Sequence, residues 1–184
     1  MEELVMTDLR KFKTKRDIQA GLIAKLQTKR FTEVTVNDIC TAALVGRSTF
    51  YHHYVDKYAL LTEMVSERAA EFDRLLDERV AVVTDDEPLL ALYEQLEGDA
   101  ATITCLLQVH EHDGDLSARY LYSLARHAET LLPRVTLPVP QDFVLELYST
   151  TALTAISWSL RHGEPEAISH FMNQVVKTML STEA

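Results

Sequence analysis

The sequence is poor in residues that interrupt helices. Its 184 residues include only five glycines and five prolines, and the alternating runs of β-branched and aromatic residues that are typical of strands are nearly absent. No apolar stretch approaches the ~18 residues that a membrane-spanning helix needs. Hydrophobic residues make up 47% of the chain and charged residues 25%, which is ordinary usage for a globular protein. The sequence therefore predicts an all-α fold without a membrane span.

Cysteine is also scarce. Cys40 and Cys105 lie in apolar helical contexts, with no second cysteine or histidine at metal-ligand spacing, so neither a disulfide framework nor a zinc site is indicated. Residues 1–16 place acidic residues before the basic ones and contain no apolar core of the kind found in signal peptides. We therefore expect a cytoplasmic protein without a bound metal.

The motifs that usually carry catalysis are missing as well. The chain contains no G-x-S-x-G nucleophile elbow, no phosphate-binding P-loop and no H-E-x-x-H zinc motif. We therefore predict that the protein is not an enzyme and needs no cofactor.

The net charge of -10 conceals an uneven distribution. Residues 10–60 hold ten Lys and Arg against four Asp and Glu, whereas residues 61–184 hold eight against 21. A basic segment joined to an acidic body favours an N-terminal part that binds a polyanion such as DNA. The alternative is that the basic residues only form a solvated face.

Three helices are predicted in this basic segment. Apolar residues recur at helical spacing over residues 7–30, 36–43 and 47–54. Thr35 stands at an N-cap position, and Asp38 three residues later completes a box-like cap. A longer helix followed by two short helices and a tight turn is the pattern of a helix-turn-helix, in which the last helix enters the major groove of DNA.

The run FTEVTVNDICTAALVGRSTFYHHYVDKYALL, residues 31–61, resembles the DNA-binding signature of the TetR (tetracycline-repressor) family. The matching positions keep the family's spacing without a gap: Thr35, Ile39, Ala42, Ala43, Val45, Thr49, Tyr51, His53, Lys57 and Leu60, with Tyr54 in place of Phe. The sequence departs from the pattern twice, because Leu44 replaces the usual turn glycine and Gly46 replaces the usual capping serine.

The resemblance implies a transcriptional regulator, usually a repressor, that binds a palindromic operator in double-stranded DNA. Its DNA-binding residues would be Thr35, Arg47, Ser48, Thr49, Tyr51, His52, His53 and Lys57. Residues 47–49 would lean toward the bases, with the arginine pairing with a guanine. Residues 51–53 would contact phosphates, as would Thr35 and both the ammonium and the backbone N–H of Lys57. Phe50 and Tyr54 would face the core.

The remaining chain predicts a helical body, which gives about nine helices in all. We expect helices over residues 57–82, 89–97, 99–109, 116–132, 142–161 and 164–180, with a DNA-binding domain at 1–56 and an effector-binding and dimerisation domain at 57–184. The resemblance implies a homodimer in which the last two helices form a four-helix bundle with their copies. Small residues in the penultimate helix suit such close packing: Ser149, Thr150, Thr151, Ala152, Thr154, Ala155 and Ser157.

The effector is the least determined part. Tyr93, Tyr120, Tyr122 and Phe143 are candidates to line an effector pocket, with core packing as the alternative. The HEHDGD segment, residues 110–115, reads as a solvated polar loop, with a metal-sensing site as the alternative. The effector is a small molecule or a protein, or there is none. A helical adaptor protein, and an activator in place of a repressor, remain alternative functions.

Overall fold

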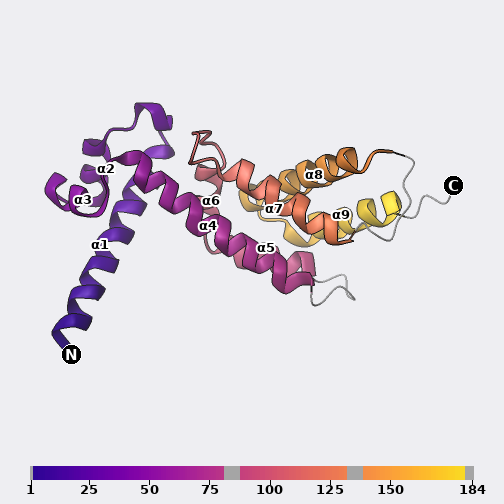
Figure 1. Cartoon of the computed structure of the whole chain (residues 1–184), viewed down its shortest axis with the longest axis horizontal. Coiled ribbons are helices and arrows are strands. Elements are labelled where there is room, and N and C mark those ends of the chain that lie inside the picture. The colour runs from indigo at the N-terminus through magenta and orange to yellow at the C-terminus, as the bar shows by residue number, and fades with distance from the viewer. Residues whose placement is uncertain (1, 81–87, 132–138, 181–184) are drawn as a thin grey trace.

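The computed structural model describes residues 2–80, 88–131 and 139–180, which form nine α-helices and one 3₁₀ turn (Figure 1). The elements are α1 (Glu2–Leu26), η1 (Phe31–Glu33), α2 (Val36–Ala43), α3 (Arg47–His53), α4 (Lys57–Val80), α5 (Pro88–Glu97), α6 (Ala100–Leu106), α7 (Leu116–Leu131), α8 (Gln141–His162) and α9 (Pro165–Leu180). The all-α prediction is confirmed. None of the described helices combines the length and the apolar character that crossing a membrane requires.

Two helix ends lie earlier than predicted. α1 runs over Glu2–Leu26 rather than 7–30, because the N–H groups of Thr28 and Lys29 both bond to the carbonyl of Lys25 and close a turn. α6 ends at Leu106 rather than at residue 109, since the N–H groups of Gln108 and Val109 bond to carbonyls three residues back. The expected extensions over residues 81–82 and 132 lie outside the described residues.

A common core holds α1, α2, α3 and the start of α4 together. Ile18, Leu22, Ile39, Phe50 and Leu60 are each fully buried, and α1 packs along α2. This is the predicted helix-turn-helix, supported by a long first helix (Figure 1).

The close contact between α1 and α2 depends on Gly21. A Cβ atom at this position would lie 2.8 Å from the carbonyl oxygen of Ile39 and 2.9 Å from the Cβ of Ala43. The absence of a side chain therefore lets the backbones of the two helices approach.

α4 belongs to both parts of the molecule. Figure 1 shows it running from the helix-turn-helix into the body, where it packs against α7. Phe72 of α4 stacks on Tyr120 of α7 with ring centroids 3.8 Å apart. Arg126 of α7 also pairs with Asp73 at 2.9 Å. The helix that starts beside α3 is thus fixed to the body around Phe72 and Asp73.

Candidate nucleic-acid interface

The helix α3 is held from behind by two aromatic residues. Phe50 and Tyr54 are 0% and 4% exposed, as the sequence predicted. The Tyr54 hydroxyl donates to Glu63 of α4 at 2.7 Å, and burial together with this hydrogen bond raises the pKa of Tyr54. Lys15 of α1 pairs with the same Glu63 carboxylate at 2.7 Å. α3 is therefore anchored to both α1 and α4.

The opposite face of α3 is open to solvent. Arg47, Ser48, Tyr51 and His52 are exposed, and the Tyr51 side chain keeps 50% of its surface accessible. Arg47 takes part in no ion pair with another described residue, so its guanidinium has its hydrogen-bond donors available. Thr49, a further predicted contact, is partly buried. This is the face that a helix-turn-helix presents to the major groove.

The turn before α3 holds a leucine in a left-handed backbone conformation. Leu44 adopts a left-handed conformation with φ of 55° and exposes 93% of its side chain. Glycine adopts this conformation without strain, whereas a Cβ makes it costly. Gly46 at the N-cap of α3 provides no side-chain cap, so the substitution for the usual serine is not compensated there.

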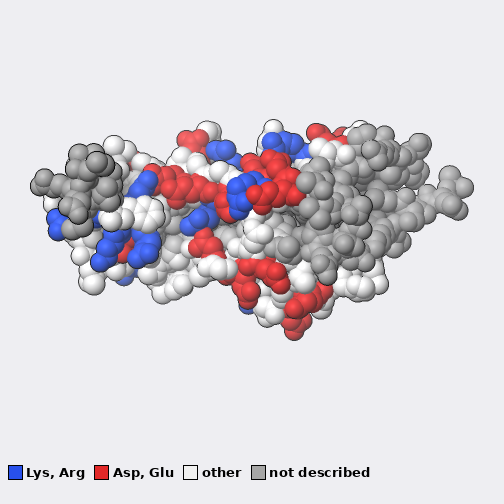
Figure 2. Space-filling view, turned by 90° about the horizontal axis from the view of Figure 1, so that it is seen from below, with Lys and Arg blue, Asp and Glu red and all other residues white. Residues whose placement is uncertain are grey.

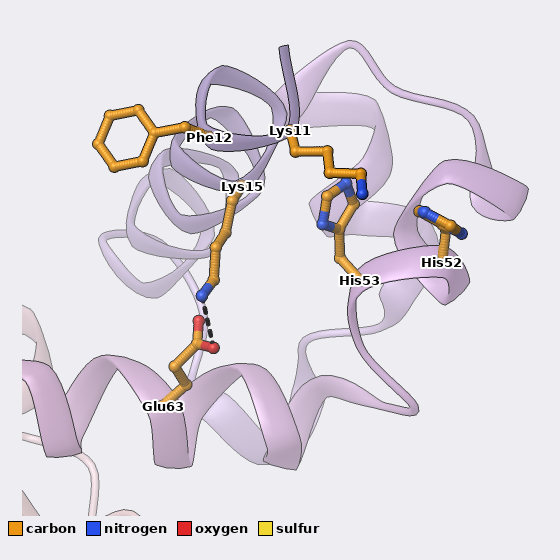
Figure 3. A pocket seen from close by; sticks show the side chains of 6 residues that line it. All are labelled: Lys11, Phe12, Lys15, His52, His53 and Glu63. Carbon is orange, nitrogen blue, oxygen red and sulfur yellow. Dashed lines mark ion pairs between the residues drawn. The ribbon is translucent and has the colours of Figure 1, made fainter. Parts of the chain in front are cut away.

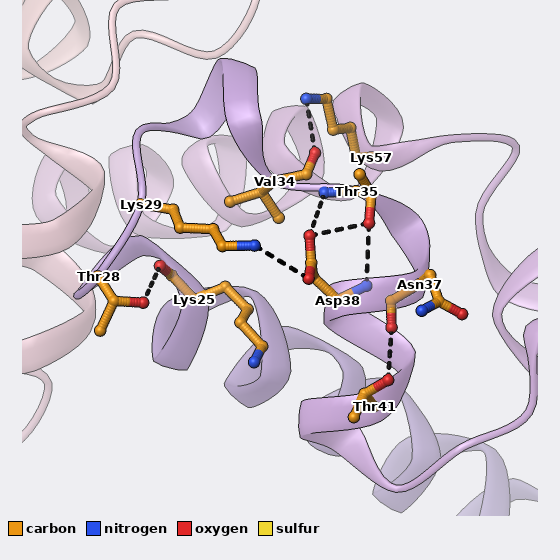
Figure 4. Close-up of polar contacts among 9 residues, drawn as sticks. All are labelled: Lys25, Thr28, Lys29, Val34, Thr35, Asn37, Asp38, Thr41 and Lys57. Atoms are coloured by element: carbon orange, nitrogen blue, oxygen red, sulfur yellow. Dashed lines mark hydrogen bonds and ion pairs between the residues drawn. The ribbon is translucent and has the colours of Figure 1, made fainter.

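The N-terminus of α2 carries the predicted capping box (Figure 4). The Thr35 side chain accepts a hydrogen bond from the backbone N–H of Asp38, and the Asp38 carboxylate accepts one from the backbone N–H of Thr35. Lys29 pairs with Asp38 at 3.1 Å. The hydrogen bonds from Thr35 and Lys29 lower the pKa of Asp38 to about 2. The Thr35 hydroxyl donates to the same carboxylate at 2.8 Å, so it serves the cap while remaining exposed at the surface.

The side chain of Lys57 points into the helix-turn-helix, whereas the sequence suggested that it contacts a DNA phosphate. Its ammonium donates to the carbonyl oxygens of Phe31, Thr32 and Val34 at 2.8, 3.2 and 2.8 Å, and it lies 4.7 Å from the centre of the Phe31 ring. All three N–H donors of the ammonium are thereby engaged. The expected ammonium contact with phosphate does not fit this placement, and only the backbone N–H in the first turn of α4 remains for such a contact.

Unpaired cations surround α3. Apart from Lys57, whose ammonium is held by backbone carbonyls, six basic residues between positions 10 and 60 form no ion pair with another described residue: Arg10, Lys11, Lys13, Arg16, Lys25 and Arg47. Figure 2 shows Lys and Arg gathered at the end of the molecule that holds the helix-turn-helix, whereas Asp and Glu lie along the body. The field of this end therefore attracts polyanions.

The four predicted effector residues do not face one common cavity. Tyr93 and Tyr120 are 2% and 0% exposed, whereas Tyr122 and Phe143 are 71% and 54% exposed. Tyr120 lies in the core against Phe72. Its hydroxyl is buried and has no hydrogen-bond partner within residues 2–80, 88–131 and 139–180. Two of the four residues therefore belong to the core and two to the surface.

The HEHDGD loop pairs its histidines with its own aspartates. His110 contacts Asp115 and His112 contacts Asp113, both at 2.9 Å. The described part of the chain contains no group of three or more His, Cys, Asp or Glu placed to hold a metal ion. The loop also packs on α4, because Gly114 lies directly against Leu61.

Two positions beside α3 were not singled out by the sequence reasoning. Glu63 reads as one of many charges on a long helix, and only the fold brings it to Tyr54 and Lys15. Lys11 had a usable signal, because it lies four residues before Lys15 and so on the same face of α1.

Comparisons with known proteins agree with this geometry. The sequence profile described as "Bacterial regulatory proteins, tetR family" matches residues 26–64, which span the end of α1, α2, α3 and the start of α4. No curated protein sequence matches the chain.

Solved structures match over nearly the whole chain. A TetR transcriptional regulator from Streptococcus agalactiae 2603V is 25% identical, with 94% of this chain and 98% of that chain covered and a TM-score of 0.67. A putative TetR-family regulator from Syntrophomonas wolfei is 16% identical, with coverages of 92% and 98% and a TM-score of 0.66. The fatty acid degradation regulator FadR from Bacillus halodurans is 15% identical, with coverages of 92% and 95% and a TM-score of 0.65.

The profile match covers the helix-turn-helix. The structural matches also include the helices of the body. Residues 26–64 thus carry the DNA-binding domain of the tetR family of bacterial regulatory proteins, and the chain as a whole has the fold of TetR-family transcriptional regulators.

Proposed function

We propose that the protein is a repressor that binds a palindromic operator as a homodimer and reads the sequence through α3. The observation that carries this proposal is the outer face of α3, where Arg47, Ser48 and Tyr51 are exposed while Phe50 and Tyr54 hold the helix from behind. An arginine at the start of such a helix can donate two hydrogen bonds to a guanine, which is worth about 1–3 kcal/mol of discrimination. The remaining predicted contacts, Ser48, Thr49, Tyr51, His52 and His53, lie on the same short helix.

A homodimer through α8 and α9 is supported by their solvent-facing stripes. Phe143, Leu147, Thr150 and Thr154 are all exposed and follow one face of α8 at helical spacing. Phe171 of α9 is 59% exposed. Exposed apolar side chains in a row mark a surface that a partner covers.

The small residues of α8 divide between two surfaces. Ser149, Ala152 and Ala155 are buried inside the subunit, where α7 and α9 pack on α8. Only Thr150 and Thr154 lie on the outer stripe. The proposed dimer contact therefore rests on Phe143 and Leu147 more than on close approach of small residues.

Control by an effector is the third element of the proposal. The buried Tyr120 hydroxyl lacks a partner within the described residues, and Arg68 and Asp99, paired at 2.6 Å, contribute to its electrostatic surroundings. An unpaired buried hydroxyl costs free energy until a ligand or water satisfies it. This makes Tyr120 the candidate among the four aromatic residues to contact an effector.

The test is a selection of bound fragments from a random pool of duplex DNA, followed by sequencing. We expect a palindromic site with two half-sites about one helical turn apart, or a multiple of that spacing. In the same selection, Arg47→Ala should relax the preference at one symmetric pair of base positions and leave the others intact. Enrichment of no sequence by the wild-type protein would refute the proposal, and an unchanged site with Arg47→Ala would refute the role of this arginine.

The oligomeric state is tested separately by sedimentation equilibrium. Phe143→Asp combined with Phe171→Asp should turn the dimer into a monomer, because two charges would be buried at the interface. Tyr122→Asp is the matched control, since it also places a charge at an exposed aromatic position but lies on α7. Dissociation by the control variant alone would assign the interface to another surface.

A further inference from the structure

Leu44 combines the greatest exposure with the least favourable backbone of the large apolar residues that the structure describes. Its side chain is 93% exposed, against 80% for Val55, the next in order, and its φ of 55° is the one positive value among the described residues other than glycine. The recognition helix α3 begins three residues later at Arg47. Single exposed apolar residues are common on protein surfaces, but this one also occupies a costly conformation.

The turn at Leu44 closes α2 in the way that usually requires glycine. The N–H of Leu44 bonds to the carbonyl of Thr41, and the N–H of Val45 bonds to that of Cys40, which is the Schellman closure of a helix end. Glycine is preferred at the left-handed position because a Cβ there is strained. Leucine therefore strains the backbone without filling any part of the core.

The same turn holds Leu44 in a fixed place. Two hydrogen bonds fix its backbone, and the next residue, Val45, packs against the core. The Cα–Cβ bond of Leu44 therefore has one direction in the free protein, so that little freedom is left to lose on binding. Strained residues that their surroundings hold in this way are concentrated at binding sites.

The surface around Leu44 is continuous with the outer face of α3. Asn37 and Thr41 are exposed on α2, and Arg47 and Ser48 are exposed at the start of α3. The Thr41 hydroxyl donates to the carbonyl of Asn37 at 2.8 Å (Figure 4). Leu44 lies between these two pairs in the chain and is the apolar residue among them.

The two ends of α3 offer different chemistry to DNA. At the C-terminal end, Lys11 of α1 lines one pocket with His52 and His53 (Figure 3), so this end is polar and basic. At the N-terminal end, Leu44 places an apolar group next to Arg47. The N-terminal residues of a recognition helix contact base edges in the major groove. The apolar group that this groove presents is the C5 methyl of thymine.

We propose that Leu44 contacts the C5 methyl group of a thymine in each half-site of the operator and thereby helps Arg47 to specify the sequence. The inference rests on the proposed DNA-binding function, and it adds a residue outside the recognition helix to the residues that read bases. Because three residues of chain span at most about 10 Å and base pairs are about 3.4 Å apart, the thymine lies within about three base pairs of the guanine that pairs with Arg47.

The methyl contact is tested by replacing thymines of the selected duplex with deoxyuridine, one symmetric pair at a time. Deoxyuridine keeps the hydrogen-bonding groups of thymine and lacks only the methyl. Burial of one such carbon is worth about fourfold in affinity, so the loss of a symmetric pair should weaken binding by about 15-fold. We expect one pair at which the wild type shows this loss in fluorescence anisotropy. Leu44→Ala should bind the thymine duplex more weakly than the wild type and should not distinguish it from the deoxyuridine duplex.

Two further variants separate the contact from an effect on folding. Val55→Ala is the matched control, because it also shortens an exposed apolar side chain of the helix-turn-helix but lies beyond the other end of α3. It should discriminate against deoxyuridine as strongly as the wild type. Leu44→Gly relieves the backbone strain, so it should unfold at a higher temperature than the wild type and yet bind the thymine duplex more weakly.

Three results would overturn the proposal. A deoxyuridine effect that persists in Leu44→Ala would assign the methyl to another side chain. The absence of any sensitive pair, or of thymine within the expected distance in the selected site, would mean that the protein reads no methyl there. Equal affinity of Leu44→Ala and the wild type for the thymine duplex would show that the leucine does not contact DNA.

These results are separate from a failure of the proposed function. If the wild-type protein binds no duplex at low salt, then DNA binding itself is refuted. If the wild type selects a palindromic site and Leu44→Ala binds every duplex as the wild type does, DNA binding stands and only the leucine contact is refuted.

Discussion

Lys57 and Val34 are joined by a hydrogen bond of 2.8 Å between the side-chain ammonium and the backbone carbonyl, which ties the first residue of α4 to the turn before α2. The same ammonium also bonds to the carbonyls of Phe31 and Thr32. A residue that the family resemblance placed on the DNA thus closes the helix-turn-helix from inside.

Removing this ammonium should destabilise the fold. Lys57→Met leaves three partly buried carbonyl oxygens without their charged donor, and hydrogen bonds to charged groups contribute about 1.5–3 kcal/mol each. Because water reaches part of the site, we expect a loss of about 2 kcal/mol in the free energy of unfolding, measured by urea denaturation. The exposed, unpaired Lys13→Met serves as the control. An unchanged stability together with a smaller salt slope of DNA binding would show that the ammonium contacts phosphate instead.

Gly21→Ala should loosen the contact between α1 and α2. The new methyl group would lie 2.8 Å from the carbonyl oxygen of Ile39, and overpacking of this kind costs about 1–3 kcal/mol. This exceeds the gain in helix propensity from glycine to alanine. Gly98→Ala is the control, because nothing lies within 4 Å of its added Cβ. Thermal unfolding of both variants should show a lower midpoint for Gly21→Ala only.

Leu44→Gly should stabilise the protein. The left-handed backbone at Leu44 penalises a Cβ by about 1–2 kcal/mol, and the side chain is 93% exposed, so its removal loses little packing. After the greater freedom of glycine in the unfolded chain is subtracted, a gain of about 0.5–1 kcal/mol remains. Leu44→Ala keeps the Cβ and should leave the free energy of unfolding nearly unchanged. A loss of stability in Leu44→Gly would mean that the leucine side chain makes a contact that its exposure does not reveal.

The capping box at α2 predicts an acid-dependent part of the stability. Folding lowers the pKa of Asp38 from 3.8 to about 2. The carboxylate therefore stabilises the folded state fully above about pH 4, and this contribution is lost as the pH falls through about 2. The free energy of unfolding of the wild type should exceed that of Asp38→Asn at pH 5, and the difference should shrink toward pH 2. Thr35→Ala removes one partner of Asp38 and should reduce the same difference. A difference that stays constant over this range would contradict the assignment.

Local features of the site were predictable and distant contacts were not. The capping pair Thr35 and Asp38 lies within one turn of chain, so spacing alone identifies it. The inward Phe50 and Tyr54 follow from helical periodicity. The acceptors of Lys57, by contrast, lie 23 to 26 residues earlier in the chain, and no periodic pattern relates them to it.

Which residues of α8 are buried and which are exposed could not be predicted for the same reason. Ser149 and Thr150 are neighbours of similar size, yet one is buried and the other exposed. Composition shows that the helix is rich in small residues, but which face meets the rest of the subunit depends on where α7 and α9 pack.

Because α4 is one unbroken helix, a movement in the body is passed on to the helix-turn-helix. Phe72 lies 15 residues after the start of α4, which is about 22 Å at a rise of 1.5 Å per residue, so a tilt of about 10° about Phe72 moves the first turn of α4 by about 4 Å. Two recognition helices must meet the major groove about 34 Å apart in a dimer, and a shift of this size in each subunit would put both out of step with the grooves. A small displacement near Phe72 is therefore amplified, by length alone, into a change of fit on DNA.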